Sequence, residues 1–387
     1  MQTDLLHPSA AKGYVPGMIR ACQIASQGAP LFAKNMKEFT GFSSFDMFSS
    51  VMFGEMTSLA GGNSDNAENK RFCEVSLAGT KKMNPMVRDP VTKIKKKIGI
   101  KTKDYAAFEA NLDESRRIAT SKMKEFRRRK ENGELSEFEQ NSYASRALDR
   151  FLESAGEEDA LEEDEVTEIL VVALIAAMDT TSSMLNWCLI HLAMNPDIQE
   201  ELHKEVEANV AKAGGSLTVD CFTKSSSVYL DAFLRENHRM TKPVGVNIVK
   251  ENVTEAVELH GTTIPKGNVF ILESRSVGMD PNFVKDPDVF DPSRWFKDQV
   301  AKRKGTPAEI LDHPLYKEPF SAGARKCPGS RVARYEVRAL LSQLVLDWEI
   351  TLADNGDAKP ETWRDIQYFN GLTVQPEIPE LSFKRRQ

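Results

Sequence analysis

Cysteine is scarce in this chain of 387 residues, which contains five. The number is odd and no two cysteines follow the C-x-x-C spacing, so neither a disulfide framework nor a zinc site is indicated. The five are Cys22, Cys73, Cys188, Cys221 and Cys327. Because disulfides persist mainly in oxidising compartments, the sequence predicts an intracellular protein.

An excess of positive charge is also absent. The formal net charge is -6 at pH 7, and the isoelectric point lies near 5.7. Proteins that bind nucleic acids concentrate lysine and arginine to neutralise phosphates, so we expect no nucleic acid partner.

Long hydrophobic runs are missing as well. The longest, residues 169–178, is too short to cross a bilayer and is followed at once by Asp179. The first residues contain neither a basic segment leading into an apolar one nor an arginine-rich amphipathic pattern. We therefore expect no targeting or anchor segment in this chain.

The chain instead contains helical patterns first and strand patterns late. Apolar spacing and composition predict helices over Lys103–Glu131, Asp164–Met194 and Val228–Met240. The second is apolar on most faces and should lie at the centre of the domain. Strands are expected in a hairpin over residues 260–274 and within residues 348–352 and 372–383, and irregular segments over residues 61–70, 211–218 and 297–319. The predicted fold is mostly α with a small β portion.

The most informative stretch is the loop of residues 320–329, which contains Cys327. Gly323 and Gly329 allow backbone conformations and close approaches that a side chain would block, and Arg325 adds positive charge. Positive charge and the amide groups at the entry of a following helix favour a thiolate, which can serve as an axial metal ligand. An inert cysteine buried at a turn is the alternative for any single cysteine.

The pattern F-x-x-G-x-R-x-C-x-G, from Phe320 to Gly329, resembles the haem-binding loop of the cytochrome P-450 superfamily. The resemblance implies heme b (iron protoporphyrin IX) as cofactor and Cys327 as the ligand of its iron. It also implies that Phe320, Gly323, Arg325 and Gly329 surround the cofactor, with Arg325 on a haem carboxylate.

Glu236 and Arg239 lie three residues apart and share one face of a predicted helix. By itself this spacing is common and is typical of a solvated ion pair. Downstream, residues 290–295 (FDPSRW) resemble the family segment whose arginine completes a buried three-charge cluster with such a pair. The resemblance therefore implies a structural cluster of Glu236, Arg239 and Arg294.

The sequence AAMDTT of residues 176–181 lies inside the long apolar helix. Small residues and hydroxyls there can serve ordinary helix packing, with the hydroxyls bonded to the preceding turn. The stretch also resembles the family's oxygen-binding motif, in which Ala176 and Ala177 would face the haem. In that motif the threonine, here Thr180, donates a hydrogen bond to dioxygen, and Asp179 helps to deliver protons through water. The resemblance implies that these two residues are catalytic.

Residues 276–295 resemble another family segment, G-R-D-P-x-x-F-x-x-P-x-x-F-x-P-x-R-W, with Met279 where arginine is common. The resemblance extends almost to the end of the chain but includes only the later part of the family pattern. An earlier family helix carries W-x-x-x-R, whereas the first tryptophan here is Trp187. We therefore expect the family fold without its N-terminal helices and first strands.

On this basis the chain is expected to be one incomplete domain over residues 1–387, helix-rich over 1–245 and mixed over 246–387. The implied function is a haem-thiolate monooxygenase that hydroxylates a lipophilic small molecule, such as a sterol, fatty acid or terpenoid, with dioxygen. One alternative is a haem-thiolate isomerase or dehydratase that needs no dioxygen, which the intact Asp179–Thr180 pair disfavours. The other is a truncated product without catalysis.

The sequence after the cysteine, CPGSRVARYEV, resembles the mitochondrial class of the superfamily, which takes electrons from a small acidic ferredoxin. A basic docking face, or else a merely solvated basic surface, would consist of Arg235, Lys326, Arg331 and Arg334. An NADPH-dependent flavoprotein reductase is the alternative donor. The resemblance favours a mitochondrial membrane location over the endoplasmic reticulum, and the basic residues of 93–103 could touch an anionic membrane surface.

Overall fold

The structure is a computed structural model of the chain. It describes residues 7–63, 66–88, 95, 98–153, 163–244, 248–272, 275–321, 323, 326–356, 358–371 and 373–387. The chain forms two compact units: unit 1 comprises Met1–Ser227, Pro328–Ile366 and Ile378–Gln387, and unit 2 comprises Val228–Cys327 and Gln367–Glu377. The predicted mostly α fold with a small β portion is confirmed. The single domain with a change of character near residue 245 stays a prediction.

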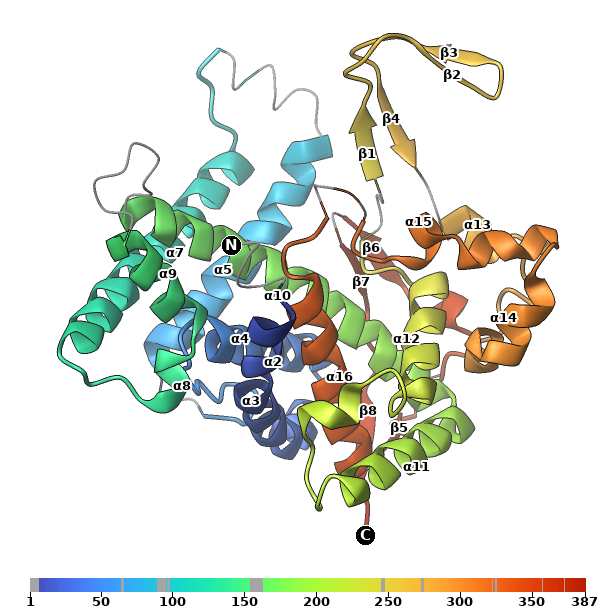
Figure 1. The fold of residues 1–387 in the computed structure, drawn as a ribbon, viewed down its shortest axis with the longest axis horizontal. Helices are drawn as coiled ribbons and strands as arrows, with labels where there is room; N and C mark the ends of the chain where they lie inside the picture. Colours follow the sequence, from blue (N-terminus) through green and yellow to red (C-terminus); the bar gives the residue numbers. More distant parts are fainter. Residues whose placement is uncertain are drawn as a thin grey trace. The chain divides into compact units, whose positions relative to one another are not determined.

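Unit 1 is built almost entirely from helices (Figure 1). In chain order these are α2 (Pro8–Gly13), α3 (Val15–Gly28), η1 (Ala29–Phe32), α4 (Met36–Met52), α5 (Ala67–Arg88), α7 (Lys103–Glu131), α8 (Glu137–Gln140), α9 (Tyr143–Glu153), α10 (Glu163–Met194), α11 (Pro196–Lys212), η2 (Val219–Phe222), α16 (Ser330–Asp347) and η5 (Trp363–Asp365). Two strands, β5 (Trp348–Leu352) and β8 (Leu381–Arg385), form an antiparallel ladder in which Ile350 lies opposite Phe383.

The long helix α10 runs through the middle of unit 1 and packs against α4, α5, α7 and α16 (Figure 1). Within the described parts of the chain, it is the one helix long and apolar enough to cross a membrane by length and composition alone. Half of its most apolar window is buried inside the structure. Packing against four helices accounts for this apolarity, because a helix that is hydrophobic on most faces is normally a core helix.

Helix α4 is buried along nearly its whole length and combines phenylalanine with serine. Phe39 and Phe45 are fully buried in the core, whereas the Ser44 hydroxyl donates to the Thr40 carbonyl of its own helix at 2.7 Å. The Thr40 hydroxyl in turn donates to the side-chain oxygen of Asn186 on α10 at 2.6 Å. These buried hydroxyls are therefore paired, which offsets the cost of removing them from water.

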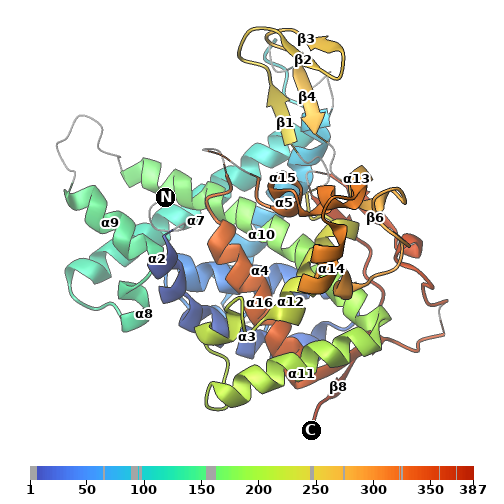
Figure 2. The ribbon, with the colours of Figure 1, turned by 45° about the vertical axis from the view of Figure 1, so that its right-hand side comes forward.

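Unit 2 has shorter elements. Its helices are α12 (Val228–Met240), α13 (Arg275–Met279), η3 (Pro292–Trp295), α14 (Lys297–Arg303), η4 (Pro307–Asp312) and α15 (Pro314–Lys317). Its antiparallel strand pairs are β1 (Ile248–Glu251) with β4 (Val269–Leu272), β2 (Val257–Leu259) with β3 (Thr262–Ile264), and β6 (Tyr368–Asn370) with β7 (Val374–Pro376). Figure 2 shows the first two pairs as one continuous arm. The arm turns at His260 and Gly261, both with positive φ, as a two-residue type I′ hairpin requires.

Several local predictions were wrong. The hairpin expected over residues 260–274 does not form, because β3 and β4 pair with the upstream strands β2 and β1. Residues 297–319 are not irregular but form α14, η4 and α15. Helix α5 begins at Ala67, inside the expected loop of residues 61–70. Partners of short strands and short helical turns depend on tertiary contacts, which local patterns do not report.

Replacing Gly28 by alanine should destabilise the protein by about 3 kcal/mol, the upper end of the usual cost of overpacking. A Cβ atom on Gly28 would lie 2.1 Å from the carbonyl oxygen of Ala60, which is a backbone atom and cannot swing away. The matched control is Gly79→Ala in α5, where a Cβ would meet no atom within 4 Å. The control should be neutral or slightly stabilising. Equal urea midpoints for the two variants would contradict this packing.

Candidate functional site

Cys327, the candidate iron ligand, is held in a hydrogen-bonded loop at the end of unit 2. Its side chain is partly exposed, whereas the other four cysteines are buried. The Cys327 amide donates to the Phe320 carbonyl at 3.0 Å, and the Lys326 amide donates to the Gly323 carbonyl at 3.1 Å. These bonds close the loop and hold the cysteine next to Phe320.

The loop depends on an unusual backbone conformation at two positions. Ser321 and Gly323 have φ values of 64° and 78°, in the left-handed region. A Cβ atom at Gly323 would meet no atom within 4 Å, so this glycine serves backbone conformation rather than packing. Gly329 precedes α16 with φ -86°, a value open to any residue. Arg325, expected on a haem carboxylate, lies outside the described residues.

The surroundings of Cys327 also differ chemically from those of the buried cysteines. Burial raises the pKa of Cys22, Cys73 and Cys188, which keeps these thiols protonated. Helix α16 begins at Ser330, three residues after Cys327. The first amides of a helix have no partner within it and favour negative charge nearby. Cys327 is thus a partly exposed thiol just before a helix, whereas the other four cysteines are buried.

The four residues of the predicted oxygen-binding motif lie in the middle of α10, in unit 1. Thr180 is half-buried and its hydroxyl donates to the Ala176 carbonyl at 2.9 Å. Asp179 is only 8% exposed, whereas Ala176 is exposed and Ala177 half-buried. One turn earlier Val172 is 60% exposed. Because residues four apart share a helix face, Val172, Ala176 and Thr180 form one stripe of α10, the uncovered stripe, which is exposed at Val172 and Ala176 and half-buried at Thr180.

Glu236, Arg239 and Arg294 meet in one cluster in unit 2. The side chains of Glu236 and Arg239 are completely buried, and Arg239 donates two hydrogen bonds to the Glu236 carboxylate, at 2.9 and 2.7 Å. Arg294 Nε donates to the same carboxylate at 3.2 Å. The Asp291 amide and the Trp295 indole add hydrogen bonds of 3.0 and 2.9 Å. These donors offset the loss of water that burial imposes on the carboxylate.

Arg239 also binds the segment that contains the Asp-Pro turns. Its Nη1 atom donates to the carbonyl oxygens of Gly278 and Pro287 at 2.7 and 2.8 Å. Met279, which stands where the family often has arginine, places its sulfur 3.5 Å from the same nitrogen. A thioether is a weak acceptor, so this departure adds no second positive charge beside Arg239.

The sequence analysis did not identify two residues that contribute to these clusters. The first is Trp295, the last residue of the motif FDPSRW, whose indole completes the Glu236 cluster. The second is Glu336 on α16, a carboxylate that is 3% exposed and lies close to the oxygen-binding motif through Thr181. A single acidic residue within the apolar face of a helix was the available signal for Glu336.

The described residues fit a haem in their chemistry. Cys327, at the end of unit 2, offers an accessible soft sulfur ligand for iron. In the part of the chain that the structure describes, no group of three or more His, Cys, Asp or Glu side chains could hold a metal ion.

The comparison with known families agrees with this chemistry. The family model for cytochrome P450 matches residues 23–379, a span that includes every candidate residue. The chain belongs to the cytochrome P450 family. Members of this family bind heme b through a cysteine thiolate. In this P450 the cysteine of the matching loop is Cys327.

Curated relatives match parts of this P450. Mitochondrial sterol 26-hydroxylase of Rattus norvegicus is 35% identical over 182 residues, which are 46% of this chain and 32% of the relative. The Homo sapiens protein of the same name is 33% identical over 214 residues, 55% of this chain and 37% of the relative. The 2-hydroxyisoflavanone synthase of Glycine max is 29% identical over 260 residues, 65% of this chain and 48% of the relative. The chain thus spans about a third to a half of the length of these relatives.

Glu236→Ala should destabilise this P450 by about 3–5 kcal/mol, because it leaves the buried Arg239 without its counter-charge. The measurement is urea unfolding followed by circular dichroism.

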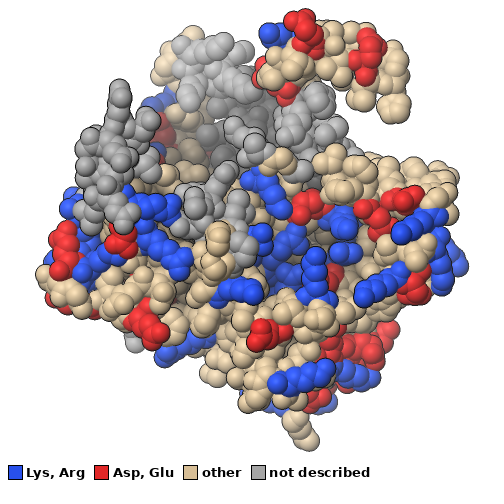
Figure 3. Space-filling model, in the orientation of Figure 1, with Lys and Arg blue, Asp and Glu red and all other residues tan. Residues whose placement is uncertain are grey.

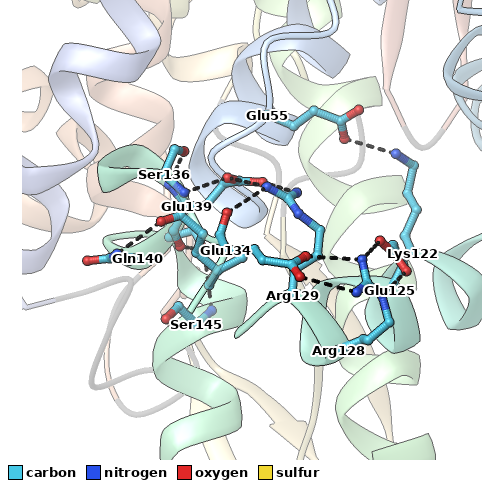
Figure 4. A network of polar contacts seen from close by, with 12 residues as sticks. Glu55, Lys122, Glu125, Arg128, Arg129, Glu134, Ser136, Glu139, Gln140 and Ser145 are labelled. Atoms are coloured by element: carbon cyan, nitrogen blue, oxygen red, sulfur yellow. Dashed lines mark hydrogen bonds and ion pairs between the residues drawn. The ribbon is translucent and has the colours of Figure 1, made fainter. Parts of the chain in front are cut away.

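The matched control is Glu125→Ala. Glu125 forms the same two-bond pair with the arginine three residues later, Arg128, but on the exposed surface of α7 (Figure 4). Exposed pairs contribute little to stability, so this variant should unfold almost as the unmodified protein does. A similar loss in the two variants would contradict the role given to burial.

Proposed function

We propose that this P450 is a haem-thiolate monooxygenase that hydroxylates a lipophilic small molecule with dioxygen and electrons from a redox partner. The observation that carries the proposal is Cys327, a partly exposed cysteine in a hydrogen-bonded loop that has the family's sequence pattern. Two of the relatives are named sterol 26-hydroxylase, which supports a lipophilic substrate of the sterol kind.

In this proposal Cys327 holds the haem iron, with Phe320 and Gly323 in the loop around it. When bound, the haem supplies the activation of dioxygen. The protein's own part is to bind the cofactor and the substrate, to exclude water and to deliver protons.

The chain offers residues for these tasks on α10. Val172 and Ala176 are exposed and present an apolar surface to a lipophilic molecule. The Thr180 hydroxyl donates to the Ala176 carbonyl, so in this structure its proton is not directed at dioxygen as the motif implies. Its oxygen lone pairs can accept a hydrogen bond, and donation to dioxygen requires the hydroxyl to turn away from Ala176. Asp179, the adjacent carboxylate, can pass a proton through a water molecule to the oxygen-binding side.

Cys327→Ser should abolish the strongly red-shifted Soret band of the reduced protein with carbon monoxide, because a serine hydroxyl does not replace an anionic sulfur on iron. The control is Cys221→Ser, a buried cysteine of η2 in unit 1, which should keep the band. The measurement is a difference spectrum after haem supplementation. An unchanged band in Cys327→Ser would rule out the proposed ligand.

We propose a small acidic ferredoxin as electron donor. On α16, Arg331 is exposed and Arg334, three residues later on the same face, is half-buried. Figure 3 shows lysine and arginine side chains gathered over the first half of this helix. Lys326 is less available, since it pairs with Glu318 at 3.3 Å. A flavoprotein reductase is the alternative donor. A mitochondrial membrane location follows the names of the sterol hydroxylases and is proposed with the ferredoxin.

Arg331→Glu should raise the apparent KM for an acidic ferredoxin about fivefold at low salt, because a like charge opposes the encounter. The same reversal at Lys384, an exposed residue of β8, is the control and should leave the KM unchanged. Reduction of the haem is followed by absorbance at several salt concentrations. If the two reversals have equal effects, or if salt does not weaken the reaction, the ferredoxin proposal fails.

A further inference from the structure

A buried carboxyl group connects α16 to the oxygen-binding motif of α10 within unit 1. Glu336 lies on α16 and is 3% exposed, and Thr181 lies on α10 and is 4% exposed. The Thr181 hydroxyl donates to Glu336 Oε2 at 3.5 Å. The contact joins residues 155 positions apart, so it is a tertiary link between two long helices that also pack against each other.

Thr181 is next to Thr180, the candidate catalytic residue, so a contact that holds Thr181 also affects Thr180. Successive residues of an α-helix point about 100° apart, so a helix that turns one side chain toward a neighbour also sets the direction of the next. Thr181 faces α16, and Thr180 consequently lies on the uncovered stripe with Ala176. A rotation or slide of α10 that released Thr181 would redirect Thr180 as well.

Glu336 has surroundings that an ordinary structural residue seldom has. Burial raises its pKa to about 7, and the hydrogen bond from Thr181 opposes this rise only in part. No cation among the described residues contributes to the shift. The thiol of Cys22 on α3 lies close enough for the charge of Glu336 to raise its pKa, and Asp46 on α4 acts on the same thiol. Burial of a carboxyl group without a contributing cation among the described residues is costly.

We propose that Glu336 is a positioning residue that holds α10 through Thr181, so that Thr180 keeps the orientation needed for oxygen chemistry. The inference rests on the proposed monooxygenase function and adds a residue to it. Glu336 does not touch substrate or cofactor in this proposal. Because α16 begins three residues after Cys327, the same helix carries the link and follows the ligand loop in the chain.

The test compares Thr181→Val, Glu336→Leu and Glu336→Gln. The first two remove the hydrogen bond, whereas a glutamine side chain keeps an oxygen that can accept it. The measured quantity is the share of consumed reductant that appears as hydrogen peroxide. This share rises when reduced oxygen is released as peroxide before it reacts with the substrate. We expect an increase of about twofold in Thr181→Val and Glu336→Leu, the factor that corresponds to the low end of the net free energy of a buried hydrogen bond, because the O···O distance of 3.5 Å is long. The double variant should be no worse than either, and Glu336→Gln should stay near the unmodified protein.

A matched control is needed to separate a change in oxygen chemistry from a general loss of stability, and Thr40 provides it. Thr40 on α4 is a buried threonine whose hydroxyl also links a neighbouring helix to α10, through Asn186. Thr40→Val removes a shorter bond, of 2.6 Å instead of 3.5 Å, to a residue of α10 more than one turn from Thr180. It should lower the free energy of unfolding at least as much as Thr181→Val does, but leave the peroxide share unchanged. An equal rise in peroxide for the two valine variants, or additive effects of Thr181→Val and Glu336→Leu, would overturn the inference.

The pH dependence of stability is a readout that needs no haem. The carboxyl of Glu336 has a usual pKa of 4.5 when exposed and a pKa of about 7 in the fold. Between these values the folded protein binds the extra proton, so its free energy of unfolding should fall as pH rises from about 5 to about 7. Glu336→Gln lacks this portion of the fall, while any contribution from Asp46 is common to the two proteins. Parallel curves would show that Glu336 is not buried as described and would overturn the inference.

The carbon monoxide spectrum distinguishes a failure of the proposed monooxygenase function from a failure of the positioning role of Glu336. If the unmodified, haem-supplemented protein lacks the red-shifted band, the proposed function fails and the role of Glu336 in oxygen chemistry fails with it. The helix link is then judged by the unfolding energies of Thr181→Val, Glu336→Leu and the double variant. If the band is present in every variant while the peroxide share does not move, the positioning role alone is wrong.

Discussion

The buried carboxylate of Glu236 is the interaction on which unit 2 depends. Its oxygens accept hydrogen bonds from two arginines, an indole and a backbone amide, and these donors come from α12, η3 and the turn before η3. Arg239 extends the network to carbonyl oxygens near Gly278 and Pro287. A segment with little regular structure thereby takes one conformation, because leaving any of these charges unpaired in the core would cost more than the segment gains by moving.

In unit 1 the main constraint is the rotation of the long apolar helix α10 about its own axis. Apolar contacts favour burial of α10 but are weakly directional, so they do not by themselves set its rotation. Buried polar bonds restrict it, because their geometry is narrower: Asn186 accepts from Thr40 on α4 at 2.6 Å, and Thr181 makes a longer contact of 3.5 Å with Glu336 on α16. With these faces held, the stripe of Val172, Ala176 and Thr180 stays uncovered. The proposed function assigns oxygen binding to Thr180 on this stripe.

The five cysteines of this P450 differ in how far their side chains are exposed, and this difference decides which of them can bind a metal. Four thiols are buried and behave as small apolar side chains, whereas Cys327 is partly exposed in a loop closed by backbone hydrogen bonds. A metal ligand must be accessible to the metal and must ionise, and both conditions exclude a buried thiol. Exposure of Cys327 does not identify the electron donor or the substrate. Binding of these two depends on surfaces and pockets to which many elements contribute.

The sequence by itself determined the long helices α7 and α12, the strand β5 and the family, because periodicity and short motifs are local properties. It also placed Glu236 and Arg239 on one helix face, since spacing alone decides this. Only the tertiary structure decided that β3 and β4 pair with upstream strands, that Trp295 completes the cluster, and that Thr181 meets Glu336 across 155 residues. These contacts join segments distant in the chain, and their energy comes from mutual burial, which no local pattern records.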